Sequence, residues 1–68
     1  MDMIPVTSSN ISSIGYDGST MHIRFNSGGL YAYHNVPSSV YNGLMGASSK
    51  GKYFHAHIKG RYGDTRIG

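Results

Sequence analysis

A chain of 68 residues has room for one domain, and a domain of this size buries only about 60% of the surface that its unfolded form exposes. The absence of cysteine excludes disulfides and thiolate zinc sites, and no stretch approaches the roughly 18 apolar residues of a membrane span. The formal net charge is +3, and nearly all of it comes from residues 50–68. The N-terminus lacks a basic, apolar signal pattern, so we expect a single cytoplasmic domain over residues 1–68, ordered over residues 6–63.

The first half of the chain carries the patterns of β-strands, which we expect at residues 9–16, 20–25 and 30–34. In the second of these, Met21, Ile23 and Phe25 alternate with polar residues, as on a half-buried strand. The dipeptide Asp17-Gly18 suits a two-residue hairpin turn, because both central positions of that turn need positive φ. These features predict a three-stranded antiparallel meander.

The length of the second hairpin loop decides which face the tyrosines of the third strand occupy. A two-residue loop pairs Phe25 with Leu30, whereas a three-residue loop with Gly28 in the left-handed region pairs Phe25 with Gly29. A slip of one residue reverses the face of every side chain. We favour the three-residue loop, because it gathers the large side chains of both strands into one core.

The second half of the chain reads as helical. Residues 36–45 begin with a proline at a permissible first-turn position, and Val40 and Leu44 form the centre of a buried stripe. A second helix is expected from Lys52 to Lys59, with Phe54 facing inward and Ser48 or Ser49 as N-cap, followed by a loose tail over residues 64–68. The predicted fold is α+β, a three-stranded antiparallel β-meander followed by two short helices packed on one face of the sheet.

The connection before the second helix resembles a nucleotide phosphate loop only in part. Tyr53 stands where that loop needs Ser or Thr for magnesium, and the chain is too short for the parallel sheet that carries it. A Ser/Gly connection leading into a helix still offers free backbone N–H groups and a positive dipole end beside lysines. This segment (Ser49, Lys50, Gly51, Lys52) is therefore either an anion contact or a plain capped loop.

Basic and aromatic residues interleave after this connection. Lys59, Arg61 and His55 can add positive charge near Tyr53 and Tyr62. Cations that follow phosphates and rings that stack on bases are typical of nucleic-acid binding. The alternative is that this is a solvated basic face and that the aromatic rings anchor the helix to the sheet.

Catalysis and metal binding receive little support from the sequence. His55 and His57 are two residues apart, so on a helix they point to different faces, and no acidic residue or cysteine is near them in sequence. The chain has no glutamate and only three aspartates, of which Asp17 is explained by the turn. We expect neither an enzyme nor a cofactor or metal.

An ordered series of residues runs along nearly the whole chain, over residues 6–63: Ser8-Ser9-Asn10-Ile11, Ile14-Gly15-Tyr16-Asp17, Met21, Ile23, Phe25, Gly29, Tyr31, Tyr33, Val36-Pro37, Leu44, Ala47, Ser49, Gly51, Tyr53-Phe54, Ile58 and Tyr62. This series resembles the KTSC domain, a family named for the C-terminus of some lysyl-tRNA synthetases that also occurs as small bacterial and phage proteins. The chain departs from it at His55, where Asn is common, and at Gly63, where Pro is frequent. The resemblance implies this α+β fold and an RNA-binding role.

The function that we expect is a non-enzymatic nucleic-acid-binding module, with RNA rather than DNA as the expected partner, working as a monomer or weak dimer. The expected contacts lie in the basic C-terminal segment: Ser49, Lys50, Gly51, Lys52, Tyr53, His55, Lys59, Arg61 and Tyr62. The alternative is a small phage or prokaryotic regulator that binds a host protein of the transcription or translation machinery through exposed aromatic residues.

Overall fold

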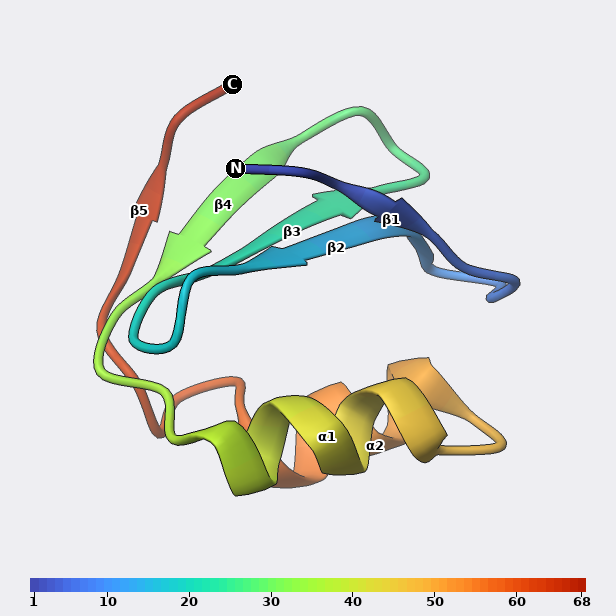
Figure 1. Cartoon of the computed structure of the whole chain (residues 1–68). Coiled ribbons are helices and arrows are strands. Elements are labelled where there is room, and N and C mark those ends of the chain that lie inside the picture. The colour runs from blue at the N-terminus through green and yellow to red at the C-terminus, as the bar shows by residue number, and fades with distance from the viewer.

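The computed structural model describes residues 1–68, and it consists of an antiparallel sheet with both helices on one of its faces (Figure 1). The elements are β1 (Ile4–Pro5), β2 (Ile11–Tyr16), β3 (Met21–Phe25), β4 (Leu30–Tyr33), α1 (Ser38–Gly46), α2 (Lys50–His57) and β5 (Asp64–Arg66). The order of the strands across the sheet is their order along the chain. The predicted α+β class and the meander at its centre are confirmed.

The sheet has five strands rather than the predicted three. β1 pairs with β2 through Ile4 and Ile14, and β5 pairs with β4 through Asp64 and Tyr33. Both additional strands are short, lie at the sheet edges and have exposed side chains, so neither carries a pattern of alternating burial. The prediction of a loose tail over residues 64–68 is therefore wrong.

β2 contains a β-bulge, which the spacing of its two buried isoleucines requires. Ile11 and Ile14 are both fully buried, although residues three apart on a regular strand point to opposite faces. The register with β3 shifts between Ile11 and Ser13, because Ile11 pairs with Phe25 and Ser13 pairs with Arg24. The additional residue of this β-bulge turns both isoleucines toward the helices.

The first hairpin turn is displaced by one residue from the predicted Asp17-Gly18 pair. The Asp17 N–H donates to the Thr20 carbonyl at 3.2 Å, so Gly18 and Ser19 are the central residues, and only Gly18 has a positive φ, of 99°. The Asp17 carboxylate instead accepts from the backbone N–H groups of Ser19 and Thr20, at 3.0 and 2.7 Å. These hydrogen bonds hold the pKa of Asp17 below its usual value.

The second hairpin has the predicted three-residue loop. The Phe25 N–H donates to the Gly29 carbonyl at 2.9 Å, and Gly28 has a φ of 105°. Ile23 therefore pairs with Tyr31 and Met21 with Tyr33, which places both tyrosines on the face that the helices cover. The preferred register is confirmed.

Both helices lie close to their predicted positions. Pro37 is the N-cap of α1, and Leu44 is its fully buried residue. α2 begins at Lys50, two residues earlier than predicted, and the Ser49 side chain accepts from the Lys52 backbone N–H at 3.4 Å. Its inward side chain Phe54 is buried, as predicted, and the chain leaves the helix at His57 rather than at Lys59.

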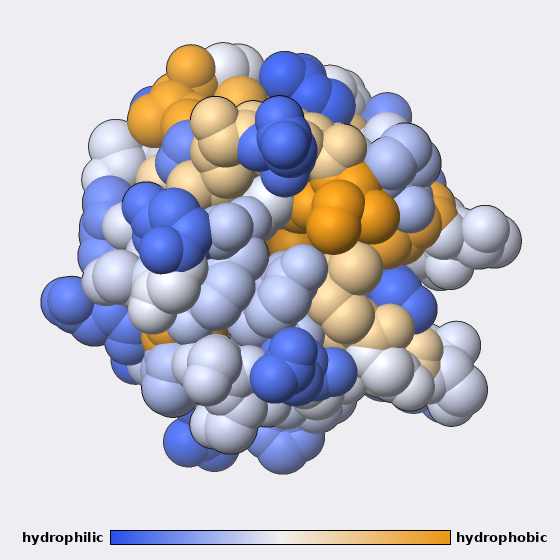
Figure 2. Space-filling model, viewed as in Figure 1, coloured by the Kyte–Doolittle hydropathy of each residue, from blue (hydrophilic) through white to orange (hydrophobic).

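The core lies between the sheet and the helices and contains Ile11, Ile14, Met21, Ile23, Tyr33, Val36, Leu44, Phe54 and Ile58. The exposed large hydrophobic residues are Met1, Ile4 and Ile67. Figure 2 shows hydrophilic and weakly polar residues over most of the face with α1 in front, with hydrophobic residues in separate patches. Neither helix is long and apolar enough to cross a membrane.

The positive φ of Gly28 gives the first testable prediction. Gly28→Ala is expected to lower the free energy of unfolding by about 1–2 kcal/mol, because an L-residue is strained at this φ. An added Cβ would meet no neighbouring atom, so the effect is conformational. The matched control is Gly46→Ala, whose Cβ also meets open space but whose φ is not positive. Urea unfolding should show an unchanged or higher stability for the control, and equal losses in both variants would contradict the assigned loop.

Candidate functional site

Two adjoining hollows run along α2, and together we call them the α2 groove. The polar end lies beside the start of α2 and is lined by Ser9, Asn10, Ser49, Gly51, Lys52, His55 and Ala56. The aromatic pocket lies between α2 and the end of the sheet and is lined by Ser9, Asn10, Phe25, Asn26, Ser27, Tyr31, Tyr33, Phe54, His55, Lys59, Gly60 and Asp64. Ser9, Asn10 and His55 line both hollows, so the two are continuous.

The floor of the aromatic pocket is a cluster of rings in edge-to-face contact. Phe25 lies 5.7 Å from Tyr31 and 5.3 Å from Phe54, and Tyr33 lies 5.5 Å from Phe54, between ring centroids. The three interplanar angles are 78°, 70° and 78°, in the range that favours interaction between ring edges and faces. This packing fixes the shape of the pocket floor.

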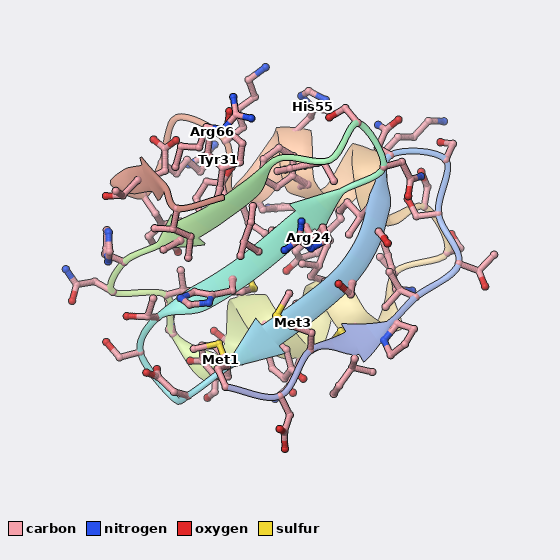
Figure 3. The ribbon with its side chains drawn as sticks, turned by 90° about the horizontal axis from the view of Figure 1, so that it is seen from above. Met1, Met3, Arg24, Tyr31, His55 and Arg66 are labelled. Atoms are coloured by element: carbon pink, nitrogen blue, oxygen red, sulfur yellow. The ribbon has the colours of Figure 1, made fainter.

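Charged groups from β5 and α2 surround this floor. The Arg66 guanidinium lies over the Tyr31 ring, 5.8 Å from its centroid. Figure 3 shows Arg66, Tyr31 and His55 along the same side of the molecule, away from Met1 and Met3. Asp64 of β5 lines the pocket, so β5 supplies one of its walls, although its residues were expected to be loose.

A cationic side runs along α2. Lys52 and His55 are three residues apart on α2, which places them on one side of the helix, and Lys59 follows two residues after its last residue; all three are exposed. Lys52 lies at the polar end of the groove and Lys59 at the aromatic pocket. The side chains of Lys52 and Lys59 make no hydrogen bond within the chain, so both ammonium groups are available to an anion.

The structure brings some of the predicted contact residues together and places others elsewhere. Ser49, Gly51, Lys52, His55 and Lys59 all line the α2 groove. The remaining predicted contacts are used inside the domain. Lys50 donates to the Ala47 carbonyl and Arg61 donates to the Ala56 carbonyl, each at 3.1 Å.

The predicted aromatic contacts Tyr53 and Tyr62 also lie outside the groove lining. Tyr53 packs against α1, because an added Cβ at Gly43 would fall on the Tyr53 hydroxyl, and its ring lies 4.4 Å from that of His57. Tyr62 is half-buried against the core. The aromatic surface of the groove comes instead from the sheet and from Phe54 of α2.

The sequence prediction missed the residues that the sheet and the N-terminal loop contribute. Asn10 lies against α2 where Gly51 has no side chain, since an added Cβ there would be 2.7 Å from the Asn10 amide nitrogen. The favoured register directed Tyr31 and Tyr33 to the core, and both are also pocket residues. The alternation in β4, taken together with the register, was the signal that placed their rings on the helix side.

Burial and charge alter the acidity of one pocket residue. Burial raises the pKa of Tyr33 to about 12, and the carboxylate of Asp64 adds to the effect. The Tyr33 hydroxyl is therefore protonated throughout the physiological range and can donate a hydrogen bond. No group of three or more histidine or acidic side chains that could hold a metal ion is found in the structure.

Comparison with known proteins identifies relatives of two kinds. The sequence model of the KTSC domain matches residues 7–62. A protein of Tsukamurella paurometabola is 37% identical over 62 residues, which are 88% of this chain and 92% of that protein. The lysine–tRNA ligase of Nostoc sp. is 46% identical over 43 residues, which are 63% of this chain and 8% of the ligase, so the chain spans only a small part of the ligase.

A solved structure resembles the whole fold. The crystal structure of a KTSC domain protein from Yersinia pestis superposes with a TM-score of 0.95 and is 40% identical in sequence. The superposition covers 98% of this chain and 97% of that protein. The similarity therefore includes both edge strands as well as the central meander.

The raised pKa of Tyr33 can be tested by alkaline titration of tyrosinate absorbance. One tyrosine should titrate at about 12, and this step should be absent in Tyr33→Phe. Asp64→Asn should move the step only part of the way toward 10.0, because burial is the larger cause. Between these two pH values the unfolded chain loses a proton that the folded chain keeps, so stability should fall as the pH rises. A full set of tyrosines titrating near 10.0 in the folded protein would contradict the partial burial of the Tyr33 side chain.

Proposed function

Since the chain belongs to the KTSC domain family, we propose that it is a non-enzymatic nucleic-acid-binding module that holds single-stranded RNA along the α2 groove. One observation carries the proposal. Lys52, His55 and Lys59 follow the same groove whose far end has an aromatic floor. The basic side chains can bind the phosphates of a nucleic acid, and the aromatic floor can stack against unpaired bases.

The electrostatics of the groove favour an anionic chain. Lys52 lies near the N-terminal end of α2, where the helix dipole adds partial positive charge. Lys59 lies at the other end of the groove, beside the aromatic pocket, and His55 lies between them. A backbone that runs along α2 would pass Lys52, then the His55 imidazole, then Lys59. This spacing distinguishes the groove from a general basic surface.

The aromatic pocket favours a single strand over a duplex. Bases in a duplex are stacked on one another, whereas the bases of a single strand can leave the stack and enter a pocket. The relatives favour RNA over DNA, because a similar segment belongs to ligases whose name gives tRNA as their substrate. We therefore propose RNA as the partner.

A catalytic role receives no support from the placement of the carboxylates. Asp17 is held by the backbone of the first hairpin turn, and Asp64 lies in the wall of the aromatic pocket. Asp2 is exposed near the N-terminus. We therefore assign Asp17 to the turn and Asp64 to binding, and we propose no catalytic role for either.

The proposal is tested with two double variants that remove the same charge. Lys52→Ala with Lys59→Ala removes the two free cations of the groove, whereas Lys50→Ala with Arg61→Ala removes two cations that donate to backbone carbonyls. Binding of a single-stranded RNA of about eight nucleotides should weaken strongly in the first and little in the second. The slope of log affinity against log salt should fall by about 0.7 for each lost phosphate contact.

Equal losses in the two double variants would show that binding depends on net charge and not on the groove. If the unaltered protein binds no RNA at low salt, the proposed function is overturned. The alternative partner, a host protein of the transcription or translation machinery, would then be favoured.

A further inference from the structure

We infer that the aromatic pocket takes one unstacked base and prefers guanine, whose edge the Asp64 carboxylate and the Tyr33 hydroxyl would read. This inference rests on the proposed function and makes it specific. It concerns the aromatic pocket of the α2 groove, because phosphate binding by the cations does not require an aromatic pocket.

The pocket has room for a flat ring and an aromatic floor beneath it. Its volume is about 760 Å³, and it is open to the surface. Phe25 and Tyr31 are half-buried, so they expose part of their rings to the pocket, and Phe54 closes its base. Stacking on aromatic side chains is worth about 1–3 kcal/mol for each base.

The two polar groups of the inference lie side by side. Asp64 and Tyr33 are directly paired across β4 and β5, and both line the pocket. Directly paired residues have side chains on the same face of a sheet, about 4.5–5.5 Å apart at their Cβ atoms. The pairing therefore presents one hydroxyl donor next to a carboxylate with two acceptor oxygens.

Among the bases, guanine complements this arrangement best. An ionised carboxylate only accepts hydrogen bonds, and the hydroxyl of Tyr33 donates one. The Watson–Crick edge of guanine presents a carbonyl oxygen followed by two neighbouring N–H donors. Uracil instead has its single N–H donor between two carbonyl oxygens, which a carboxylate repels. Adenine and cytosine offer the carboxylate an amino group but no second adjacent donor.

The charges around the pocket argue against a small organic cation as the occupant. An aromatic pocket with one carboxylate could in principle hold a cation. Here, however, Arg66 already lies over the Tyr31 ring, and Lys59 lines the same pocket. Lys59 balances Asp64 within the pocket and Arg66 adds positive charge beside it, so a neutral base on an anionic backbone fits better.

The experiment compares an oligouridine of about eight nucleotides with three oligomers that carry one central guanosine, adenosine or cytidine. The unaltered protein should bind the guanosine oligomer about tenfold more tightly than the oligouridine, as one bidentate contact allows. Asp64→Asn should abolish this preference, because an amide keeps only one acceptor oxygen. Fluorescence anisotropy with labelled oligomers gives both affinities, and a single guanosine avoids four-stranded assemblies.

The matched control is Asp2→Asn, which makes the same change of charge at a residue that does not line the groove. Loss of a negative charge by itself should strengthen the binding of all four oligomers equally, as expected for Asp2→Asn. A loss of the guanosine preference in Asp64→Asn alone is therefore not an effect of net charge. Equal binding of all four by the unaltered protein would overturn the inference and leave the proposed function standing. A guanosine preference that survives Asp64→Asn would overturn the role of Asp64. Absence of binding to every oligomer would overturn the proposed function itself.

Discussion

The backbone pairing of Phe25 with Gly29 determines which side chains of β4 lie beside those of β3. This pairing places Tyr31 beside Ile23 and Tyr33 beside Met21, all on the face toward the helices. With one residue fewer in the loop, the tyrosines would lie on the open face and the core would lose Tyr33. The aromatic pocket would disappear with them, since its floor is formed by the same rings. Core and candidate site thus depend on one register.

The position of α2 follows from the same core and determines which of its residues line the groove. Phe54 and Ile58 are buried against the sheet, one turn apart, and they fix the rotation of the helix about its axis. This rotation directs Lys52 and His55 along the groove, while Tyr53 faces α1. The residues of the basic segment therefore fall into two groups. One group lines the groove, and the other makes contacts with the rest of the domain.

The central meander and the inward side chains of α2 could be predicted from the sequence, because alternation, turn residues and helical spacing are local patterns. The edge strands could not, since β5 consists of Asp64, Thr65 and Arg66, and no local pattern marks such residues as a strand. Their pairing depends on β4, which is more than thirty residues earlier in the chain. The bulge in β2 was also missed, although the spacing of Ile11 and Ile14 contained its signal.

For the candidate site, the residue types could be predicted more easily than the orientation and contacts of their side chains. Composition marked residues 50–62 as basic and aromatic, and Ser49, Lys52, His55 and Lys59 do meet in one groove. Whether a cation is free depends on nearby carbonyl groups. Arg61, for example, donates to the carbonyl of Ala56, and a sequence does not display such a contact. The pocket wall that contains Asp64 was missed because it depends on β5.

The two edge strands also restrict how a partner can approach. An unpaired edge can accept a further strand, and proteins prevent this with short edge strands, prolines and charges. β1 has two residues, of which Pro5 has no N–H to donate, and β5 carries Asp64 and Arg66. Extension of the sheet by another chain is therefore disfavoured at both sides. Recognition is left to side chains, and the continuous hollow along α2 is where the fold presents them together.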